Sequence, residues 1–132
     1  MEPILPVTLT AAAAAALVNI WLSVRIGQVR RSTKTIHGDD GGGPLTRRMR
    51  AQLNFVENTP FVLILIGAIE VSGRGSPWLA WVATTYMLGR VAHGIGMDAE
   101  GGNRLRFFGT IITMFTLLIL AIYATLIALR IL

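Results

Sequence analysis

Two long segments without a charged residue constrain this chain more than any other feature of its sequence. They cover residues 4–24 and 107–129. At about 1.5 Å per residue, either segment is long enough as a helix to cross the roughly 30 Å hydrocarbon core of a bilayer. Composition agrees, because 53% of the residues are hydrophobic and only 14% are charged, whereas soluble domains carry about 25% charged residues. The sequence therefore predicts an integral membrane protein.

Two shorter apolar segments lie between the long ones. Their uncharged runs, residues 58–69 and 75–89, are too short to span a bilayer alone. Each becomes long enough only if polar residues enter the membrane with it, and such residues are expected to face other helices. Turn-rich stretches separate the four segments. We expect an all-α, integral membrane four-helix bundle that forms one domain over residues 1–132, with helices at about 4–29, 48–71, 77–97 and 105–130.

The positions of the basic residues decide what the net charge of +5 means, since an excess of this size could also indicate nucleic-acid binding. Most of them flank the first and third connections, at Arg30, Arg31, Lys34, Arg47, Arg48, Arg50, Arg104 and Arg106. Because basic residues are enriched in cytoplasmic loops, we predict that both of these connections lie in the cytoplasm and both termini on the non-cytoplasmic side. No nucleic-acid partner is expected.

The second predicted helix carries three polar residues on one face, because Arg50, Asn54 and Glu57 are spaced i, i+4 and i+7. Arg90 and His93 follow the same rule on the third. In antiparallel helices Glu57 and Arg90 would lie at one depth, roughly 10–14 Å into the membrane. We expect them to form an ion pair with a mainly structural role, since an unpaired charge there costs several kcal/mol.

The polar residues nearer the cytoplasmic mouth are candidates for ligand binding. Arg50, Asn54 and His93 lie there, and Arg104 and the arginines of the first connection add positive charge. Such a cluster suits a small anionic ligand with its own amine and amide groups. At the other end of the second helix, Glu70 is expected to be a solvated helix terminus.

Cysteine and histidine usage limits the chemistry. The chain has no cysteine and only two histidines, which excludes disulfides, a cysteine nucleophile and thiolate metal sites and leaves an all-histidine metal site short of ligands. Any thiol must therefore be brought by a ligand. His37, Asp39 and Asp40 are expected to be a solvated loop, with weak cation binding as the alternative.

One run on the second helix resembles a known family. Residues 50–61, RAQLNFVENTPF, are similar to the RA-x-x-N-x-x-E-x-x-P pattern of the membrane-associated proteins in eicosanoid and glutathione metabolism, the MAPEG family. The segments at residues 27–30 and 89–93 are similar to its prostaglandin E synthases. Asn103 and Arg104, followed by Phe107 and Phe108, resemble the start of the fourth helix in its glutathione transferases.

The resemblance implies a homotrimer that binds glutathione as co-substrate at subunit interfaces near the cytoplasmic side. By analogy, Arg50, Asn54 and Glu57 of one subunit would hold the tripeptide together with Arg30 of the neighbour, and we add Arg90 and His93 to this set of candidates. Arg104 matches the arginine that stabilises the glutathione thiolate. The thiolate would then attack a lipophilic electrophile from the bilayer. The short first connection resembles that of compact bacterial members, which implies the bacterial inner membrane.

The leading hypothesis is thus a membrane-bound glutathione transferase, with peroxidase activity toward lipid hydroperoxides as a further reaction to test. Two departures from the family bear on it: Met97 stands where relatives have a tyrosine, and Arg106 competes with Arg104 for the thiolate role. The alternative is a non-catalytic lipid-binding or scaffolding member of the same fold. A proton-coupled exporter ranks behind both, because the first helix has no carboxylate deep in the bilayer.

Overall fold

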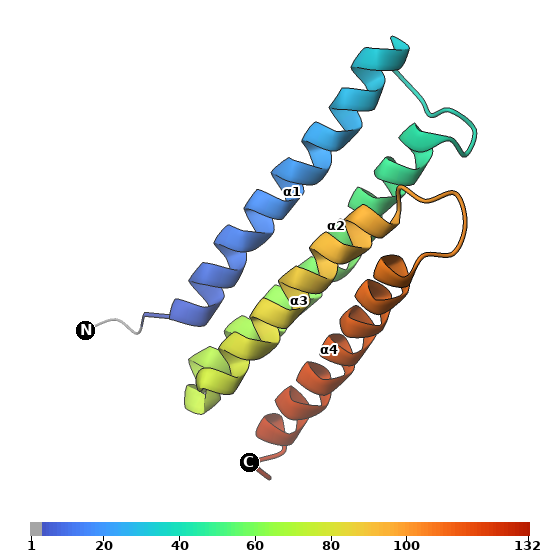
Figure 1. Ribbon diagram of the computed structural model, residues 1–132. Coiled ribbons are helices and arrows are strands. Elements are labelled where there is room, and N and C mark those ends of the chain that lie inside the picture. The colour runs from blue at the N-terminus through green and yellow to red at the C-terminus, as the bar shows by residue number, and fades with distance from the viewer. Residues whose placement is uncertain (1–3) are drawn as a thin grey trace.

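The computed structural model describes residues 4–132, which form a bundle of four antiparallel helices (Figure 1). The helices are α1 (Pro6–Thr33), α2 (Pro44–Ile69), α3 (Pro77–Gly96) and α4 (Arg104–Ala128), and a short π-helical turn, η1 (Glu70–Arg74), continues α2. The start of α1 and the end of α4 lie at one end of the bundle (Figure 1). The predicted all-α fold is confirmed, and residues 1–3 of the predicted domain lie outside the described part.

Three of the helical segments are long and apolar enough to cross a membrane: Pro6–Thr33, Pro44–Arg74 and Arg104–Ala128. The remaining helix, α3, has 20 residues and includes Arg90 and His93. Large apolar side chains are exposed on the outer surface of the bundle, as expected of a protein whose solvent is lipid; examples are Leu17, Ile20, Phe61, Ile64, Trp81, Leu88, Phe115 and Leu118. The protein is therefore a helical membrane protein.

Two helix ends differ from the positions expected from the sequence. Helix α1 continues to Thr33, four residues beyond the expected end at 29, and α2 begins at Pro44 instead of at 48. Proline is well suited to a first helical turn, because the N–H that it lacks would have no partner inside the helix. Pro6, Pro44 and Pro77 all lie in the first turn of their helices. The expected start of α2 came from charge and turn patterns, which do not mark this position.

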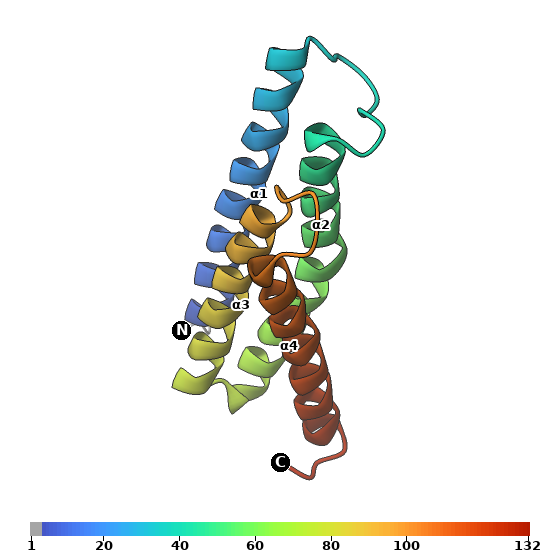
Figure 2. The ribbon, with the colours of Figure 1, turned by 45° about the vertical axis from the view of Figure 1, so that its right-hand side comes forward.

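The contacts among the helices form a ring in which α1 packs on α2 and α3, and α4 packs on α3 and α2. Helices α2 and α3 thus separate α1 from α4 (Figures 1 and 2). Helices α3 and α4 approach each other closely at glycine: a Cβ atom at Gly109 would lie 2.5 Å from the carbonyl oxygen of Gly89 and 2.6 Å from Cβ of His93. The buried core contains Leu22, Val62, Ile66, Leu79, Tyr86 and Leu120.

A carboxylate from the first residue of η1, Glu70, binds the start of α1. Glu70 accepts hydrogen bonds from the backbone N–H groups of Val7 and Thr8, at 2.9 and 2.8 Å, and from the Thr8 hydroxyl at 2.6 Å. The first N–H groups of a helix have no partner within the helix, so these bonds satisfy them. The expectation that Glu70 is a solvated helix terminus is therefore wrong, because α1 begins directly beside it.

Candidate functional site

The basic end of the bundle, as we call the end with the connections at residues 34–43 and 97–103, contains a hollow between α1 and α2. Its volume is about 610 Å³, and Arg30 from α1, Arg50 from α2 and Asp39 from the connection contribute charged side chains to it. The rest of its lining is formed by Ile26, Thr46, Met49, Gln52, Leu53 and Val56. We call this feature the α1–α2 hollow.

The guanidinium groups of the α1–α2 hollow are only weakly engaged. Arg30 donates long hydrogen bonds of 3.4 Å to the carbonyl oxygens of Thr35 and Ile36, and the Arg50 side chain is exposed. Asp39 accepts one bond, from the N–H of Gly41 at 3.0 Å. Arg30 and Arg50 of the same chain thus line one hollow, whereas the resemblance implied that Arg30 comes from a neighbouring subunit.

Sequence reasoning considered Asp39 only for weak cation binding and not as part of the anion site. It lies in the glycine-rich connection between the arginines of α1 and those of α2. This position could have indicated its role, because the connection begins and ends at the same end of the bundle and so places Asp39 near both groups of arginines. The hollow therefore combines two positive charges with one negative charge.

Arg90 lies inside the bundle and contacts Asn54 instead of Glu57. Only 2% of its surface is exposed. Its Nη1 donates to Oδ1 of Asn54 at 2.5 Å and its Nη2 to the carbonyl oxygen of Gly109 at 3.2 Å. Among residues 4–132 its Nε has no hydrogen-bond partner. The ring of Tyr86 lies 5.9 Å from the guanidinium carbon.

The predicted ion pair between Glu57 and Arg90 is therefore wrong for this chain. Three residues turn an α-helix by about 300°, so Glu57 points about 60° away from Asn54. Asn54 is half-buried toward α3, whereas Glu57 is exposed on the outer surface of α2. The ion pairs among the described residues both involve a different carboxylate, that of Asp98.

The remaining predicted site residues lie on α3 and α4. His93 is buried, and its Cβ contacts the position where Gly109 has no side chain. Arg104 lines a separate surface hollow of about 480 Å³ with Gly102, Asn103, Phe107 and Phe108. Arg104 and Arg106 are both exposed, in the first turn of α4. Within one chain, the candidates thus form three groups, the α1–α2 hollow, the Asn54–Arg90 pair beside His93, and Arg104, and Glu57 lies apart from all three.

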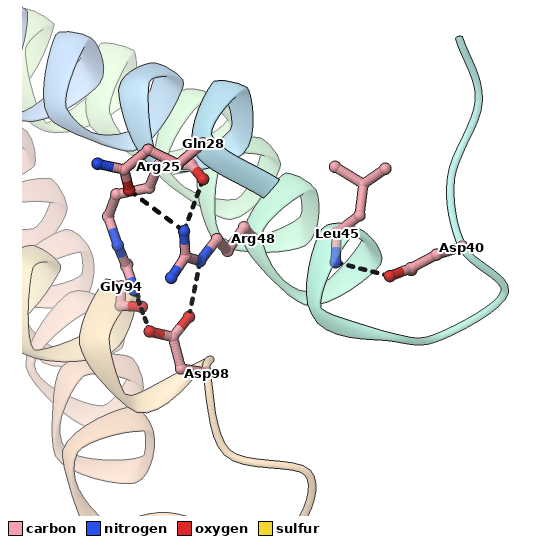
Figure 3. A network of polar contacts seen from close by, with 7 residues as sticks. All are labelled: Arg25, Gln28, Asp40, Leu45, Arg48, Gly94 and Asp98. Atoms are coloured by element: carbon pink, nitrogen blue, oxygen red, sulfur yellow. Dashed lines mark hydrogen bonds and ion pairs between the residues drawn. The ribbon is translucent and has the colours of Figure 1, made fainter. Parts of the chain in front are cut away.

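A cluster that sequence reasoning missed joins three helices at the basic end (Figure 3). Asp98 forms an ion pair with Arg25 of α1 and another, at 3.2 Å, with Nε of Arg48 of α2. Arg25 also donates to the Gly94 carbonyl oxygen at 2.8 Å, and Arg48 to the carbonyl oxygen of Arg25 at 2.7 Å. The guanidinium carbon of Arg25 lies 4.7 Å from the Trp21 ring centroid. Opposite charges at the same end of antiparallel segments could have indicated this cluster.

Asp40 of the acidic loop has a structural role, because it caps the start of α2. The Asp40 carboxylate accepts hydrogen bonds from the N–H groups of Leu45 and Thr46, at 2.8 and 2.9 Å, and from the Thr46 hydroxyl at 2.7 Å. The Leu45 bond is drawn in Figure 3. Desolvation raises the pKa of Asp40, but these hydrogen bonds outweigh it and lower the pKa to about 2. No group of three potential metal ligands occurs within residues 4–132.

These features define a class of protein: a multi-pass helical membrane protein with a charged hollow at one end of an antiparallel bundle. The sequence model of the MAPEG family matches residues 8–126, and the chain belongs to this family. Membership places it among membrane transferases and isomerases related to glutathione metabolism. A search of curated proteins found no match.

Proposed function

We propose that this protein is a glutathione-dependent transferase that conjugates glutathione to lipophilic electrophiles arriving from the bilayer. The observation that carries the proposal is the charge pattern of the α1–α2 hollow, where Arg30 and Arg50 stand with Asp39. Glutathione has two carboxylates and one ammonium group, so two cations and one carboxylate complement it. Arginine binds carboxylates through two parallel hydrogen bonds, which fixes the ligand's orientation as well as its affinity.

The Asn54–Arg90 pair supports the same ligand. Arg90 fixes the side-chain oxygen of Asn54, which leaves the amide N–H₂ group of Asn54 as a donor toward a ligand carbonyl. The Nε of Arg90 is a buried donor that finds no partner in the described part of the chain, and a buried unpaired donor costs about 1–3 kcal/mol. An acceptor from glutathione or from a neighbouring chain would remove this cost.

Arg104 is the residue that we propose to stabilise the thiolate. A cation beside a thiol with a pKa of about 8.5 lowers that pKa and raises the thiolate fraction at neutral pH. Phe107 and Phe108 line the same surface hollow as Arg104, which supports an apolar approach for the electrophile. The thiol loses its proton to water, the sulfur forms a bond to the electrophilic carbon, and the leaving group departs with its electron pair.

We propose that the active form is a homotrimer in a bacterial inner membrane, with the basic end facing the cytoplasm. Arg104 lies on α4 and the α1–α2 hollow on the other side of the bundle, so one chain does not bring them together. A neighbouring chain could supply Arg104 to the hollow. Glu57, which is exposed on a helix of membrane-spanning length, would be shielded from lipid at the same interface.

Calorimetry and ultraviolet difference spectroscopy test the proposal. The purified protein is expected to bind glutathione, to produce a thiolate band near neutral pH, and to conjugate a dinitrobenzene electrophile. Loss of the band in Arg104→Ala but not in Arg106→Ala would support Arg104, and the reverse result would assign the role to Arg106. A protein that binds no glutathione and forms no conjugate would contradict the proposal.

A second candidate function, lipid binding without catalysis, is favoured by an apolar groove between α1 and α3. Its volume is about 410 Å³, and its lining includes Val7, Ala11, Ala83, Met87 and Val91. Met97, which replaces the family tyrosine, is buried in the core and offers no hydroxyl group. This function predicts trimers whose thermal stability responds to fatty acids and not to glutathione, which a melting experiment with each ligand distinguishes.

A further inference from the structure

The Arg25–Asp98–Arg48 cluster has a position that bears on Arg104. Asp98 follows the end of α3 and lies in the connection that leads into α4, six residues before Arg104. Its two partners come from α1 and α2, so one carboxylate joins three parts of the chain. Arg25 is itself buried, with 9% of its surface exposed, and its charge is compensated by Asp98 and the Gly94 carbonyl group.

The rest of the connection is held only by local bonds. In the described chain, the other hydrogen bonds of residues 97–103 run to the last turn of α3 or to the first turn of α4. Gly101 and Gly102 have open space where a Cβ atom would be. Asp98 therefore supplies the polar contact between this connection and α1 and α2, which matters because α1 does not lie beside α4 (Figure 1).

The start of α4 is coupled to the same segment. Asn103 caps α4 by accepting from the N–H groups of Leu105 and Arg106, at 2.9 and 3.4 Å. A Cβ atom at Gly96 would collide with the backbone N of Arg106 and, at 2.9 Å, with the Asn103 side chain. The end of α3 and the first turn of α4 are thus in direct contact, and a displacement of one moves the other.

We propose that Asp98 is a positioning residue: through Arg25 and Arg48 it fixes the α3–α4 connection to the helices that bear the α1–α2 hollow, and so sets where Arg104 meets the thiol. This inference rests on the proposed function. Asp98 touches no substrate in it. Loss of these two ion pairs would leave the glutathione-binding arginines in place but displace Arg104. A displacement of about 1 Å can cost about 100-fold in rate.

The test compares full-length Asp98→Asn with Glu100→Gln, a carboxylate variant of the same connection whose side chain makes none of the hydrogen bonds seen within residues 4–132. We expect Asp98→Asn to raise the pH at which bound glutathione forms the thiolate band. The kcat for the dinitrobenzene conjugate should fall about 10- to 100-fold, while glutathione affinity stays close to wild type. Hydrogen exchange at residues 97–106 should become faster. Glu100→Gln should match the wild type, and Asp98→Glu should recover part of the loss.

The outcomes distinguish the positioning role of Asp98 from the proposed transferase function. If the wild type forms the thiolate and Asp98→Asn forms it at the same pH and rate, the positioning role is overturned and the proposed function stands. If the wild type binds no glutathione, both fail. If Asp98→Asn does not fold, Arg48→Gln provides a second test, because it removes one of the two ion pairs of Asp98. This variant is also expected to raise the pH at which the thiolate forms, and an unchanged pH would overturn the inference.

Discussion

Arg90 is a charged side chain enclosed almost completely by its own helices, and its partners are neutral. Asn54 and the Gly109 carbonyl group accept its hydrogen bonds. The sequence predicted that Glu57 and Arg90 lie at one depth on neighbouring helices, whereas Arg90 contacts Asn54, three residues before Glu57. It could not indicate which acceptor faces the guanidinium group, because residues three positions apart differ by only about 60° in direction and the rotation of α2 is set by packing along its whole length.

Substitutions at Arg90 and Glu57 test this arrangement. Arg90→Met should destabilise the protein by about 1–3 kcal/mol, because it leaves the Asn54 oxygen and the Gly109 carbonyl oxygen buried without one of their donors. Glu57→Gln should leave the stability nearly unchanged, since Glu57 is exposed. Thermal unfolding in detergent measures both. Equal losses of stability in the two variants would indicate that Glu57 and Arg90 form an ion pair after all.

Arg50→Ala tests the ligand-binding hollow. Removing a guanidinium group that binds a carboxylate should weaken glutathione binding by about tenfold or more, and calorimetry measures the change directly. Arg74→Ala is the matched control, because Arg74 is also an exposed arginine but lies at the end of η1, away from the basic end. If both variants lose affinity alike, the effect comes from net charge and not from the hollow.

Helix α2 starts earlier than expected because the side chain that caps it belongs to a residue before the capping position. Gly43 occupies the capping position and has no side chain to offer, and Asp40 supplies the carboxylate from three residues upstream. A glycine- and aspartate-rich stretch is recognisable as a turn, but which aspartate folds back is decided by the loop's three-dimensional path. The apolar segments of all four helices could be predicted, whereas this helix end could not.

The capping role of Asp40 predicts a pH-dependent contribution to stability. Its folded-state pKa of about 2 lies below the ordinary value of 3.8, so the ionised form is favoured by folding. The contribution is complete above pH 3.8 and is lost as the pH falls through about 2. Asp40→Asn should therefore lower the unfolding temperature at neutral pH, and the difference from the wild type should shrink in this acidic range. A difference that stays constant down to the lowest pH would contradict the role.

The contact between α3 and α4 predicts a cost for adding one methyl group. Gly109→Ala should destabilise the protein by about 1–3 kcal/mol through overpacking against Gly89 and His93. Gly101→Ala, where a Cβ atom meets open space, should change the stability by less than about 0.5 kcal/mol. Thermal unfolding of the two variants in the same detergent measures the difference, and equal stability would show that the helices can separate without penalty.

For the whole molecule, the arrangement of the bundle agrees with a topology that can be measured. The connections at 34–43 and 97–103 share one end with most of the basic residues, which predicts that this end faces the cytoplasm. Because the chain has no cysteine, a single introduced cysteine is the only residue of the protein that a maleimide would label. Ser76→Cys should react with a membrane-impermeant maleimide in intact cells, and Gly101→Cys only after permeabilisation. The opposite pattern would reverse the proposed orientation.

The sequence predicted the membrane location, the helical class and the family well, because these depend on long runs of apolar residues and on one spaced motif. The site was less predictable. Arg50 and Arg30 could be selected from the motif, but the Asp98 cluster depends on three segments that are far apart in the chain. A pairing of this kind has no local pattern, and only the packing of α1 against α2 and α3 brings its members together.

The two carboxylates that contact α1 also have a consequence for the depth of that helix. An apolar helix can slide along the bilayer normal or rotate with little change in its contacts with lipid, and α1 includes a featureless run of alanines at residues 11–16. Glu70 holds its first turn and Asp98 holds Arg25 near its other end. A shift by one turn, about 5.4 Å, would break both attachments at once. These two attachments, about 18 residues apart, therefore fix the position of α1 along the bilayer normal relative to the other helices, independently of membrane thickness.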